Sequence, residues 1–415
     1  MIRDFLKSCA HVCVCAGALL PGMSGADNHA FEQRVTQSVL EHPSIQAAQA
    51  ELEASLAQVK VFGSALYNPE LGAELESEGS DTNFRVGVSQ KLDWWNRQEA
   101  LSAQAENANA TAHSQYQSQL TEHFAEALRV LAEIDAAKRE LEFARSQEDQ
   151  QRQILALVEQ RQQAGDLGQV DAELAYLGLI EKITESTQAS AALTRTEAQL
   201  GKVLPGFTRP FDIPETLWNT IDQLAASGKQ AGELASEHPE AQQAMAEWQS
   251  KKSAVRLARL EAKAEPELGF GAGRSGDNNV FALSLSMPLH IRNDFSSNIE
   301  AANQALTSAQ VAYQAATQNR IAEIEASHSI LRQYRESYAQ WQEMISGRKS
   351  RNEELLERLW GAGELGTTEY LNILQQSSAA IAAGIELKTG LDQARIDWLV
   401  QSGQIQTLFM PRSEQ

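Results

Sequence analysis

The chain has 415 residues, of which 55 are acidic and 35 are Lys or Arg, and its formal net charge is −20 at pH 7. This length allows one large domain or two ordinary ones. The acidic balance and the lack of a basic patch argue against nucleic acid as a partner, because nothing would neutralise the phosphates.

The first 26 residues have the pattern of a secretory signal peptide. Arg3 and Lys7 precede an apolar run over residues 9–20, and small residues before and at Ala26 predict cleavage after it. All three cysteines of the chain lie in this segment, so we expect a mature chain without disulfides or thiolate metal sites. No small-residue lipobox precedes them, so no lipid anchor is expected. No later stretch approaches 18 apolar residues, so an exported chain would be soluble or insert as β-strands.

Two long stretches, Asn96 to Ala164 and Leu289 to Ser346, contain no Gly or Pro and are rich in helix-forming residues. One helix over the first would reach roughly 100 Å, several times the diameter of a compact domain. Alone, such helices predict an ordinary coiled coil, but the segments around them change that interpretation. Large apolar residues recur in the first at steps of three and four, as in a helix packed lengthwise on others: Leu120, Phe124, Leu128, Leu131 and Ile134.

The chain also contains a tandem duplication. Segments of the first half recur in the second at offsets of 196 to 198 residues, and a register kept so closely is not chance. We expect a signal peptide at 1–26, a first repeat at 27–204, a linking segment at 205–236, a second repeat at 237–403 and a tail at 404–415. The clearest matches are Glu41-His42-Pro43 with Glu237-His238-Pro239, Pro69-Glu70-Leu71 with Pro266-Glu267-Leu268, and residues 164–168 with 362–366.

Each repeat is predicted to contain a helix, a β-hairpin, a long helix and a return helix. The first helix begins at the proline of the His-Pro step and runs to about Leu66 or Ala264. Apolar residues at every second position then mark the hairpin strands, with polar turns at 78–83 and 274–279. The return helices are expected over 170–203 and 367–402.

These strands, of about 10 residues, have the length that a tilted strand needs to cross a bilayer. Four strands cannot close a barrel, because the smallest membrane barrels use about eight and open edges are not tolerated in lipid. Several copies must therefore pool their strands, and three copies would give 12. The fold class is mainly α with a small β part, in which the long helical hairpins form a second cylinder coaxial with the barrel.

Two pairs of residues are candidates for roles in the barrel. Trp94 and Trp95 follow the second strand, where an aromatic belt at the membrane interface belongs, although a core position at the strand-helix junction explains them too. Glu74 and Glu76 alternate with apolar residues, so we place them in the barrel lumen, where acids favour cations. The alternative is that they are exposed residues of an ordinary surface strand.

The order of these parts, with the turn Ala-Gly-acid-Leu-Gly at the far end of each long helix, resembles the TolC family of outer-membrane efflux proteins. The resemblance covers residues 31–402, and segments 68–71, 87–95 and 287–289 look like the family's strand-to-helix transitions. It implies a homotrimeric channel-tunnel, with a shared 12-stranded β-barrel in outer-membrane lipid and an α-barrel in the periplasm. Lys91 and Asn96 depart from it, standing where the family often has Pro and Gly, which leaves the geometry of the first junction open.

The same resemblance implies partners and cargo. The channel would receive small solutes, metal cations or drugs, from an inner-membrane pump of the resistance-nodulation-division type through a periplasmic adaptor, or membrane fusion protein. The compact loops and the Asn-Pro-Glu-Leu segment at 68–71 look most like the heavy-metal cation efflux branch. The sequence names neither the substrate nor the resting state of the channel.

The resemblance further assigns the two Gly-containing turns to the periplasmic tips of the hairpins, which in the family meet the adaptor. Acidic residues just after them ring the closed aperture in the family, and the matching residues are Asp171 and Glu369. Like-charge repulsion or a bridging cation could tune opening there, although acids in the first turn of a helix are also favoured by its dipole. The tip residues are Gly165, Asp166, Leu167, Gly168, Gly363, Glu364, Leu365 and Gly366.

Two other classes fit the sequence less well. The eight histidines are scattered, and no phosphate-binding loop or nucleophile elbow occurs, so we predict no catalytic residue, metal site or cofactor. The alternative function is a periplasmic coiled-coil adaptor or scaffold protein without a membrane barrel. An adaptor would have one helical hairpin between β-rich domains, and a scaffold would not need bilayer-length strands.

Overall fold

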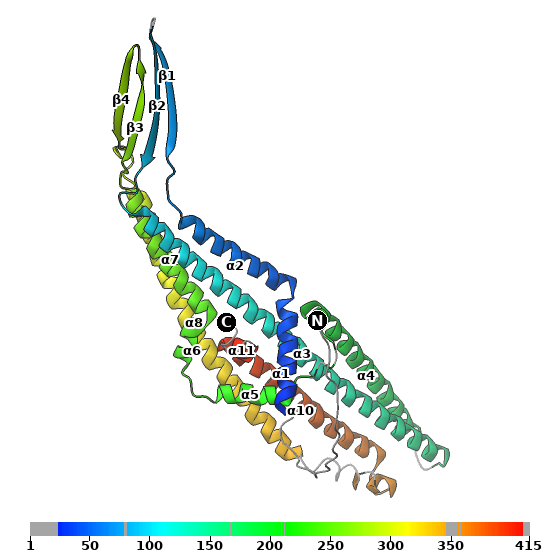
Figure 1. The fold of residues 1–415 in the computed structure, drawn as a ribbon. Coiled ribbons are helices and arrows are strands. Elements are labelled where there is room, and N and C mark those ends of the chain that lie inside the picture. Colours follow the sequence, from blue (N-terminus) through cyan, green and yellow to red (C-terminus); the bar gives the residue numbers. More distant parts are fainter. Residues whose placement is uncertain are drawn as a thin grey trace, which may run out of the picture.

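The computed structural model describes residues 24–78, 81–165, 168–208, 210, 212–345, 355–356 and 358–409. The molecule is long and thin: the strands stand at one end and the helices run away from them (Figure 1). The predicted signal peptide lies outside the described residues except for 24–26, which begin the first helix. The elements are α1 (Ser24–Leu40), α2 (Pro43–Phe62), β1 (Glu70–Glu78), β2 (Asp81–Lys91), α3 (Arg97–Gln163), α4 (Gln169–Val203), α5 (Glu215–Ala225), α6 (Ala231–Glu237), α7 (Pro239–Glu261), β3 (Glu267–Ser275), β4 (Asn278–Ser286), α8 (Ser296–Ile345), α10 (Thr367–Gln401) and α11 (Ile405–Phe409).

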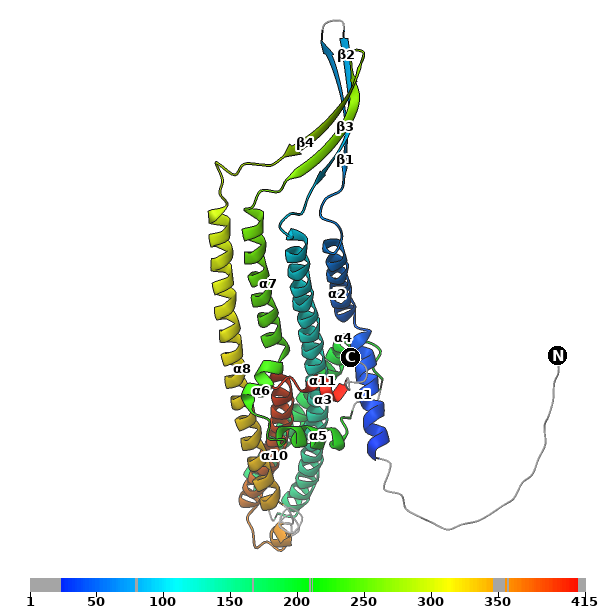
Figure 2. The same cartoon turned by 60° about the vertical axis from the view of Figure 1, so that its left-hand side comes forward.

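The order helix, hairpin, long helix and return helix occurs in both halves, and α3 is one unbroken helix. All five residues of its predicted apolar stripe are buried. Helix α3 packs on α2 and α7 toward the sheet and on α4 and α10 toward the opposite end (Figure 2). The central core gathers residues of α1, α3, α5, α10 and α11 and the end of α4 around Phe124, which stacks on Phe409 at 4.8 Å.

The second long helix is shorter than predicted, because α8 begins at Ser296 instead of Leu289. The residues before it form local side-chain bonds that compete with a helix. Asp294 Oδ1 accepts hydrogen bonds from the Ser296 backbone N–H at 3.0 Å and its hydroxyl at 2.7 Å, and Phe295 has a positive φ of 59°. The hydrogen bonds from the Ser296 hydroxyl and backbone N–H lower the pKa of Asp294.

The first junction accommodates the unusual Asn96. This residue adopts the left-handed conformation, with φ 56° and ψ 45°, which Asn tolerates better than most residues and which glycine would adopt freely. Asp93 caps the helix that follows, because its carboxylate accepts the N–H groups of Arg97 at 2.6 Å and Gln98 at 2.9 Å. The strand therefore passes into α3 without a proline at position 91.

The linking segment contains two helices that the sequence analysis did not predict. It contains α5, which buries Leu217, Trp218 and Ile221 in the central core, and α6, which buries Leu234 and Ala235. Both helices cross the outside of the long helices near the middle of the molecule (Figure 2). The prolines at 205, 210 and 214 all precede α5, so they separate it from α4 without interrupting it.

The four strands form one antiparallel sheet in the order β1-β2-β3-β4, so the two hairpins are joined through β2 and β3. The second turn is tighter than predicted, with only Gly276 and Asp277 between β3 and β4, and Gly276 has φ 57°. The register places the large apolar side chains on one face of the sheet. The pairs on that face include Leu71 with Val88, Leu75 with Phe84, Phe270 with Leu283 and Leu268 with Leu285.

The other face carries charged, polar and small residues, which we call the polar face. Gly72, Gly87 and Gly271 lie side by side on it across three strands. A Cβ at Gly273 would lie 2.1 Å from the Phe84 carbonyl oxygen, so the close approach of β2 and β3 requires glycine there. An apolar face opposite a polar face is the alternation expected of a strand between lipid and water.

Candidate functional site

The two predicted tip turns have the same backbone design. Gly165 and Gly363 follow the long helical segments with φ 81° and 75°, a conformation that favours glycine. Gly168 and Gly366 then stand at the N-cap positions of α4 and α10 in extended conformation. Asp166 and Leu167 lie outside the described residues.

The candidate aperture acids occupy the starts of the return helices. Glu369 is an exposed residue in the first turn of α10. Asp171 belongs to the first turn of α4 by its backbone. In the second tip Glu364 is exposed, whereas Leu365 packs against the cluster beneath the tips. That these acids ring an aperture stays a prediction, because it depends on other copies of the chain.

The sequence analysis did not find the contacts that hold the two tips together. The Arg161 guanidinium, on the first hairpin, lies 4.6 Å from the centre of the Trp360 ring and donates hydrogen bonds to the carbonyls of Trp360 and Gly361, both at 3.1 Å. Trp360 stacks on Tyr370 at 4.6 Å, and its indole N–H donates to the Thr367 hydroxyl at 3.2 Å. Two features of the sequence could have indicated this contact: Trp360 precedes the second tip turn, and Arg161 lies in the last turn of the long helix before the first tip turn.

A cavity of about 330 Å³ lies between the hairpins near these tips. Its walls come from α3, α4 and α10 and combine apolar side chains with amides, including Ile154, Leu177, Leu374, Gln150 and Asn372.

On the polar face of the sheet, the two candidate lumen acids have different surroundings. Glu74 lies opposite Arg85 and forms an ion pair with it at 3.4 Å, whereas Glu76 lies opposite Asn83. The sequence analysis treated both acids alike, but Arg85 offsets the charge of Glu74. Strand register decides this pairing.

The two candidate interface tryptophans also differ. Trp94 is 64% exposed, as an interfacial residue would be. Trp95 donates its indole N–H to the Ala264 carbonyl at 2.8 Å, and the Lys263 ammonium lies 4.4 Å from its ring centre. Trp95 therefore joins the start of α3 to the end of α7, so the junction interpretation describes its contacts within one copy.

A cluster of buried charges links α5 to three long helices. Asp392, 2% exposed at its side chain, receives Lys388 at 2.6 Å, Arg395 at 3.1 Å and Arg139 at 3.4 Å. Asp222 on α5 pairs with Arg395 at 2.7 Å and with Arg335 of α8 at 2.6 Å. Burial opposes ionisation of Asp222, but the hydrogen bonds and charges of the two arginines lower its pKa overall.

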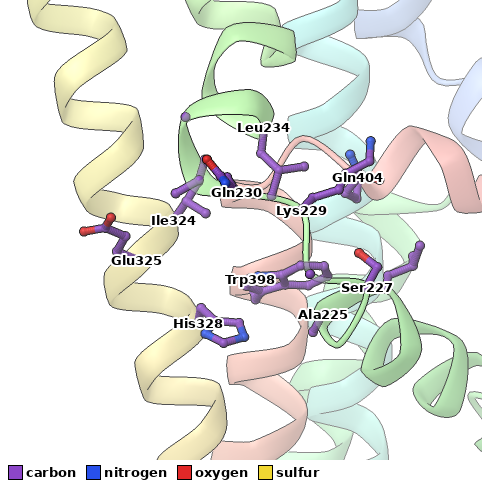
Figure 3. A pocket seen from close by; sticks show the side chains of 14 residues that line it. Ala225, Ser227, Lys229, Gln230, Leu234, Ile324, Glu325, His328, Trp398 and Gln404 are labelled. Carbon is purple, nitrogen blue, oxygen red and sulfur yellow. The ribbon is translucent and has the colours of Figure 1, made fainter.

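Beside this cluster lies a cavity of about 490 Å³, bounded by the α5–α6 loop, α8 and α10 (Figure 3). Its walls combine His328 and Glu325 with Trp398 and the loop residues Ser227 to Gln230. Within the described residues no three His, Cys, Asp or Glu side chains are grouped to hold a metal ion. None of the described helices is both long and apolar enough to cross a membrane.

Comparison with known proteins agrees with this architecture. Residues 35–206 match the family described as outer membrane efflux protein. A comparison with curated proteins found no match.

Solved structures with the same fold are outer-membrane proteins. The Campylobacter jejuni CmeC outer membrane channel superposes with a TM-score of 0.73 at 14% identity, covering 91% of this chain and 86% of that one. The open state of the Neisseria gonorrhoeae MtrE outer membrane channel superposes with a TM-score of 0.70 at 14% identity, covering 90% of this chain and 88% of that one. The Vibrio cholerae outer membrane protein VceC superposes with a TM-score of 0.74 at 12% identity, covering 90% of this chain and 96% of that one.

The four-stranded sheet and the paired helical hairpins thus form the fold of these outer-membrane channels, and the family match over residues 35–206 agrees with that fold.

Proposed function

We propose that three copies of this chain form a channel-tunnel that carries small solutes, metal cations or drugs, from an inner-membrane pump through a periplasmic adaptor to the exterior. Each copy would contribute its four strands to a 12-stranded barrel and its hairpins to an α-barrel. The observation that carries the proposal is the seam between the two repeats within one copy.

The equivalent pairing, between β4 and β1, is not made within one copy of the chain. Strand β2 of the first repeat pairs with β3 of the second, while β1 and β4 form the two edges of the sheet. Since β4 is the repeat equivalent of β2, and β1 of β3, the same geometry pairs β4 of one copy with β1 of the next. The pair Val86 with Ala272 then corresponds to Leu283 with Leu75 of the next copy.

The helices support the same arrangement. Long helix α3 contacts return helix α10 of the other repeat, and near the tips Gln147 bonds Ser378 across this seam. The positions equivalent to Gln147 and Ser378 in the other repeat are Met344 on α8 and Ile180 on α4. Both side chains are apolar, and within one copy Met344 is 58% exposed and Ile180 is 47% exposed. Burying such residues against another copy is favourable, at about 25 cal/mol per Å² of apolar surface.

The adaptor and pump rest on the family match and on the tips. The exposed tip residues and the cavity of about 330 Å³ between the hairpins offer a surface for the adaptor. We propose that Trp94 and Trp95 mark the inner membrane interface and that Glu74 and Glu76 face the lumen. We further propose that Asp171 and Glu369 ring the periplasmic aperture, so Asp171→Ala with Glu369→Ala should raise single-channel conductance or leak. Unchanged conductance and unchanged sensitivity to bulky antibiotics would remove the gate assignment.

Cysteine cross-linking tests the trimer directly. Leu75→Cys with Leu283→Cys should give covalent trimers under oxidation in membranes, because the proposed register places the two side chains opposite each other on one face. Glu74→Cys with Leu283→Cys is the matched control, since these side chains would point to opposite faces. Heat-modifiable trimers in mild detergent are the expected companion result. A monomer or dimer that extracts without detergent would favour the alternative, a periplasmic adaptor or scaffold.

A further inference from the structure

Two equivalent histidines connect helices near the middle of the molecule. His42 is the N-cap of α2, where its Nδ1 accepts the Ser44 backbone N–H at 3.3 Å. His238 is the N-cap of α7 and accepts the Glu240 N–H at the same distance. Each ring also reaches the last turn of its return helix, because Nε2 lies 3.2 Å from the Lys202 carbonyl in one repeat and 3.4 Å from the Val400 carbonyl in the other.

These bonds indicate which ring nitrogen donates and which accepts. A nitrogen that accepts a backbone N–H carries no proton, and a nitrogen that binds a carbonyl must donate one. The proton of the neutral His238 ring therefore lies on Nε2. A second proton on Nδ1 of His238 would face the Glu240 N–H and would remove the cap. At His42, Nδ1 also lies 2.7 Å from the Ser44 hydroxyl.

The surroundings of His238 add to this cost. The ring is buried, and the positive charge of Arg320 on α8 disfavours its protonation. Arg320 also pairs with Glu240 of α7 and with Glu323 of its own helix. The neighbouring α6 and α10 contribute backbone groups, the carbonyls of Ala235 and Val400.

In the first repeat, His123 occupies the position equivalent to Arg320. The ring of His123 on α3 lies 4.2 Å from that of His42, and its Nε2 lies 3.2 Å from the Val203 carbonyl. Its Nδ1 is 4.0 Å from the Glu126 carboxylate. The α1 side contributes the Val39 carbonyl, which accepts the His42 backbone N–H at 3.1 Å.

The helices that these rings join lead in opposite directions. Helices α2 and α7 run from the rings to the strands, whereas α4 and α10 return to the rings from the tips (Figure 2). The ring of His238 also needs Gly403, where a Cβ would lie 3.2 Å from its Cδ2. We propose that His42 and His238 are acid-sensitive links which, on protonation, release the helices leading to the barrel from the helices returning from the tips.

The direction of the pH effect follows from the burial of the His238 and His123 rings. Burial and the charge of Arg320 lower the pKa of His238 to about 4, and burial and the charge of His42 lower that of His123. Because the unfolded chain takes up these protons near pH 6.5, the stabilisation is complete above pH 6.5. It is lost as the pH falls toward about 4, the folded value of His238.

The test compares the full chain in detergent with the double variant His42→Asn, His238→Asn. Asparagine caps helices well but does not titrate in this range. Between pH 7.5 and 5.0 we expect the apparent unfolding midpoint of the wild type to fall by about 3 °C or more beyond that of the variant. His328→Asn, at an exposed position, should behave as the wild type. Equal pH dependence of the wild type and the double variant would overturn the proposal.

A second measurement covers the case in which the double variant does not fold. Hydrogen exchange of the wild type, corrected for intrinsic rates, should accelerate on acidification in the first turns of α2 and α7. The first turn of α5, which has no histidine cap, is the internal control. Equal protection at both pH values would overturn the proposal, and neither readout depends on transport.

Discussion

The guanidinium of Arg161 covers the ring of Trp360 at 4.6 Å, so the last turn of one long helix holds the tip of the other hairpin. The same arginine binds two carbonyls of that tip. The tips are thus joined within one copy by a side chain that belongs to neither turn.

Removing this contact should loosen the tips. A cation–π contact contributes about 0.5–2 kcal/mol, and the two hydrogen bonds add to it. We expect Arg161→Ala to increase proteolysis near residue 360 and to raise leak through reconstituted channels. Arg152→Ala, which removes an exposed arginine that pairs only with Glu148 and Asp149 of its own helix among the described residues, should change neither. If both variants behave alike, the contact with Trp360 does not hold the tips.

The second hairpin should be sensitive to side chains on α10. A Cβ at Gly384 would lie 2.0 Å from the Trp341 ring, so this glycine leaves the space that the tryptophan fills. Gly384→Leu should lower stability by about 1–3 kcal/mol through overpacking, and Trp341→Ala in the same chain should restore part of it. Gly232→Ala, where a Cβ meets nothing within 4 Å, is the control. Thermal unfolding in detergent provides the measurement, and no rescue by the double variant would contradict the packing argument.

The buried charges at Asp392 should matter more than similar pairs at the surface. Asp392→Asn leaves Lys388, Arg395 and Arg139 without their shared carboxylate, which should cost about 3–5 kcal/mol. Asp397→Asn breaks an exposed pair with Arg129 and should cost less than about 1 kcal/mol. Comparable losses of stability in the two variants would show that burial does not strengthen the network.

We predict that Asp222 causes a separate loss of stability in acid, at a lower pH than the loss caused by the histidines. Since its pKa lies below the ordinary 3.8, its contribution to stability is present above that pH and is lost as the pH falls through the lower folded value. We expect Asp222→Asn to destabilise the protein at neutral pH and to reduce the loss of stability below pH 3.8. A variant that unfolds in acid along the same pH profile as the wild type would contradict this assignment.

Ion selectivity should depend on Glu76 more than on Glu74. Glu74→Gln with Arg85→Gln removes a pair of opposite charges and leaves the net charge of the polar face unchanged. Glu76→Gln removes a carboxylate and should reduce the preference for cations. Reversal potentials in a salt gradient measure both variants. Equal shifts would show that the Arg85 pairing does not offset the Glu74 charge.

Much of this fold follows from local sequence. The absence of Gly and Pro between Asn96 and Ala164 leaves nothing to end a helix, and α3 covers nearly all of that stretch. Alternation in residues 281–289 indicated a strand because side chains on a strand alternate between its faces, although β4 ends at Ser286. The duplicated turns indicated where the chain reverses, since Gly165 and Gly363 adopt positive φ.

Partners across elements were decided by the tertiary structure. The sequence showed acids at 74 and 76, but only the pairing of β1 with β2 brings Arg85 to Glu74. It placed His42 and His238 directly before the prolines that begin two helices, yet the carbonyls of Lys202 and Val400 that their rings also reach lie about 160 residues away. Local propensity fixes the helices and strands because their hydrogen bonds are local or follow a short period, whereas charge pairing depends on which distant segments the packing brings together.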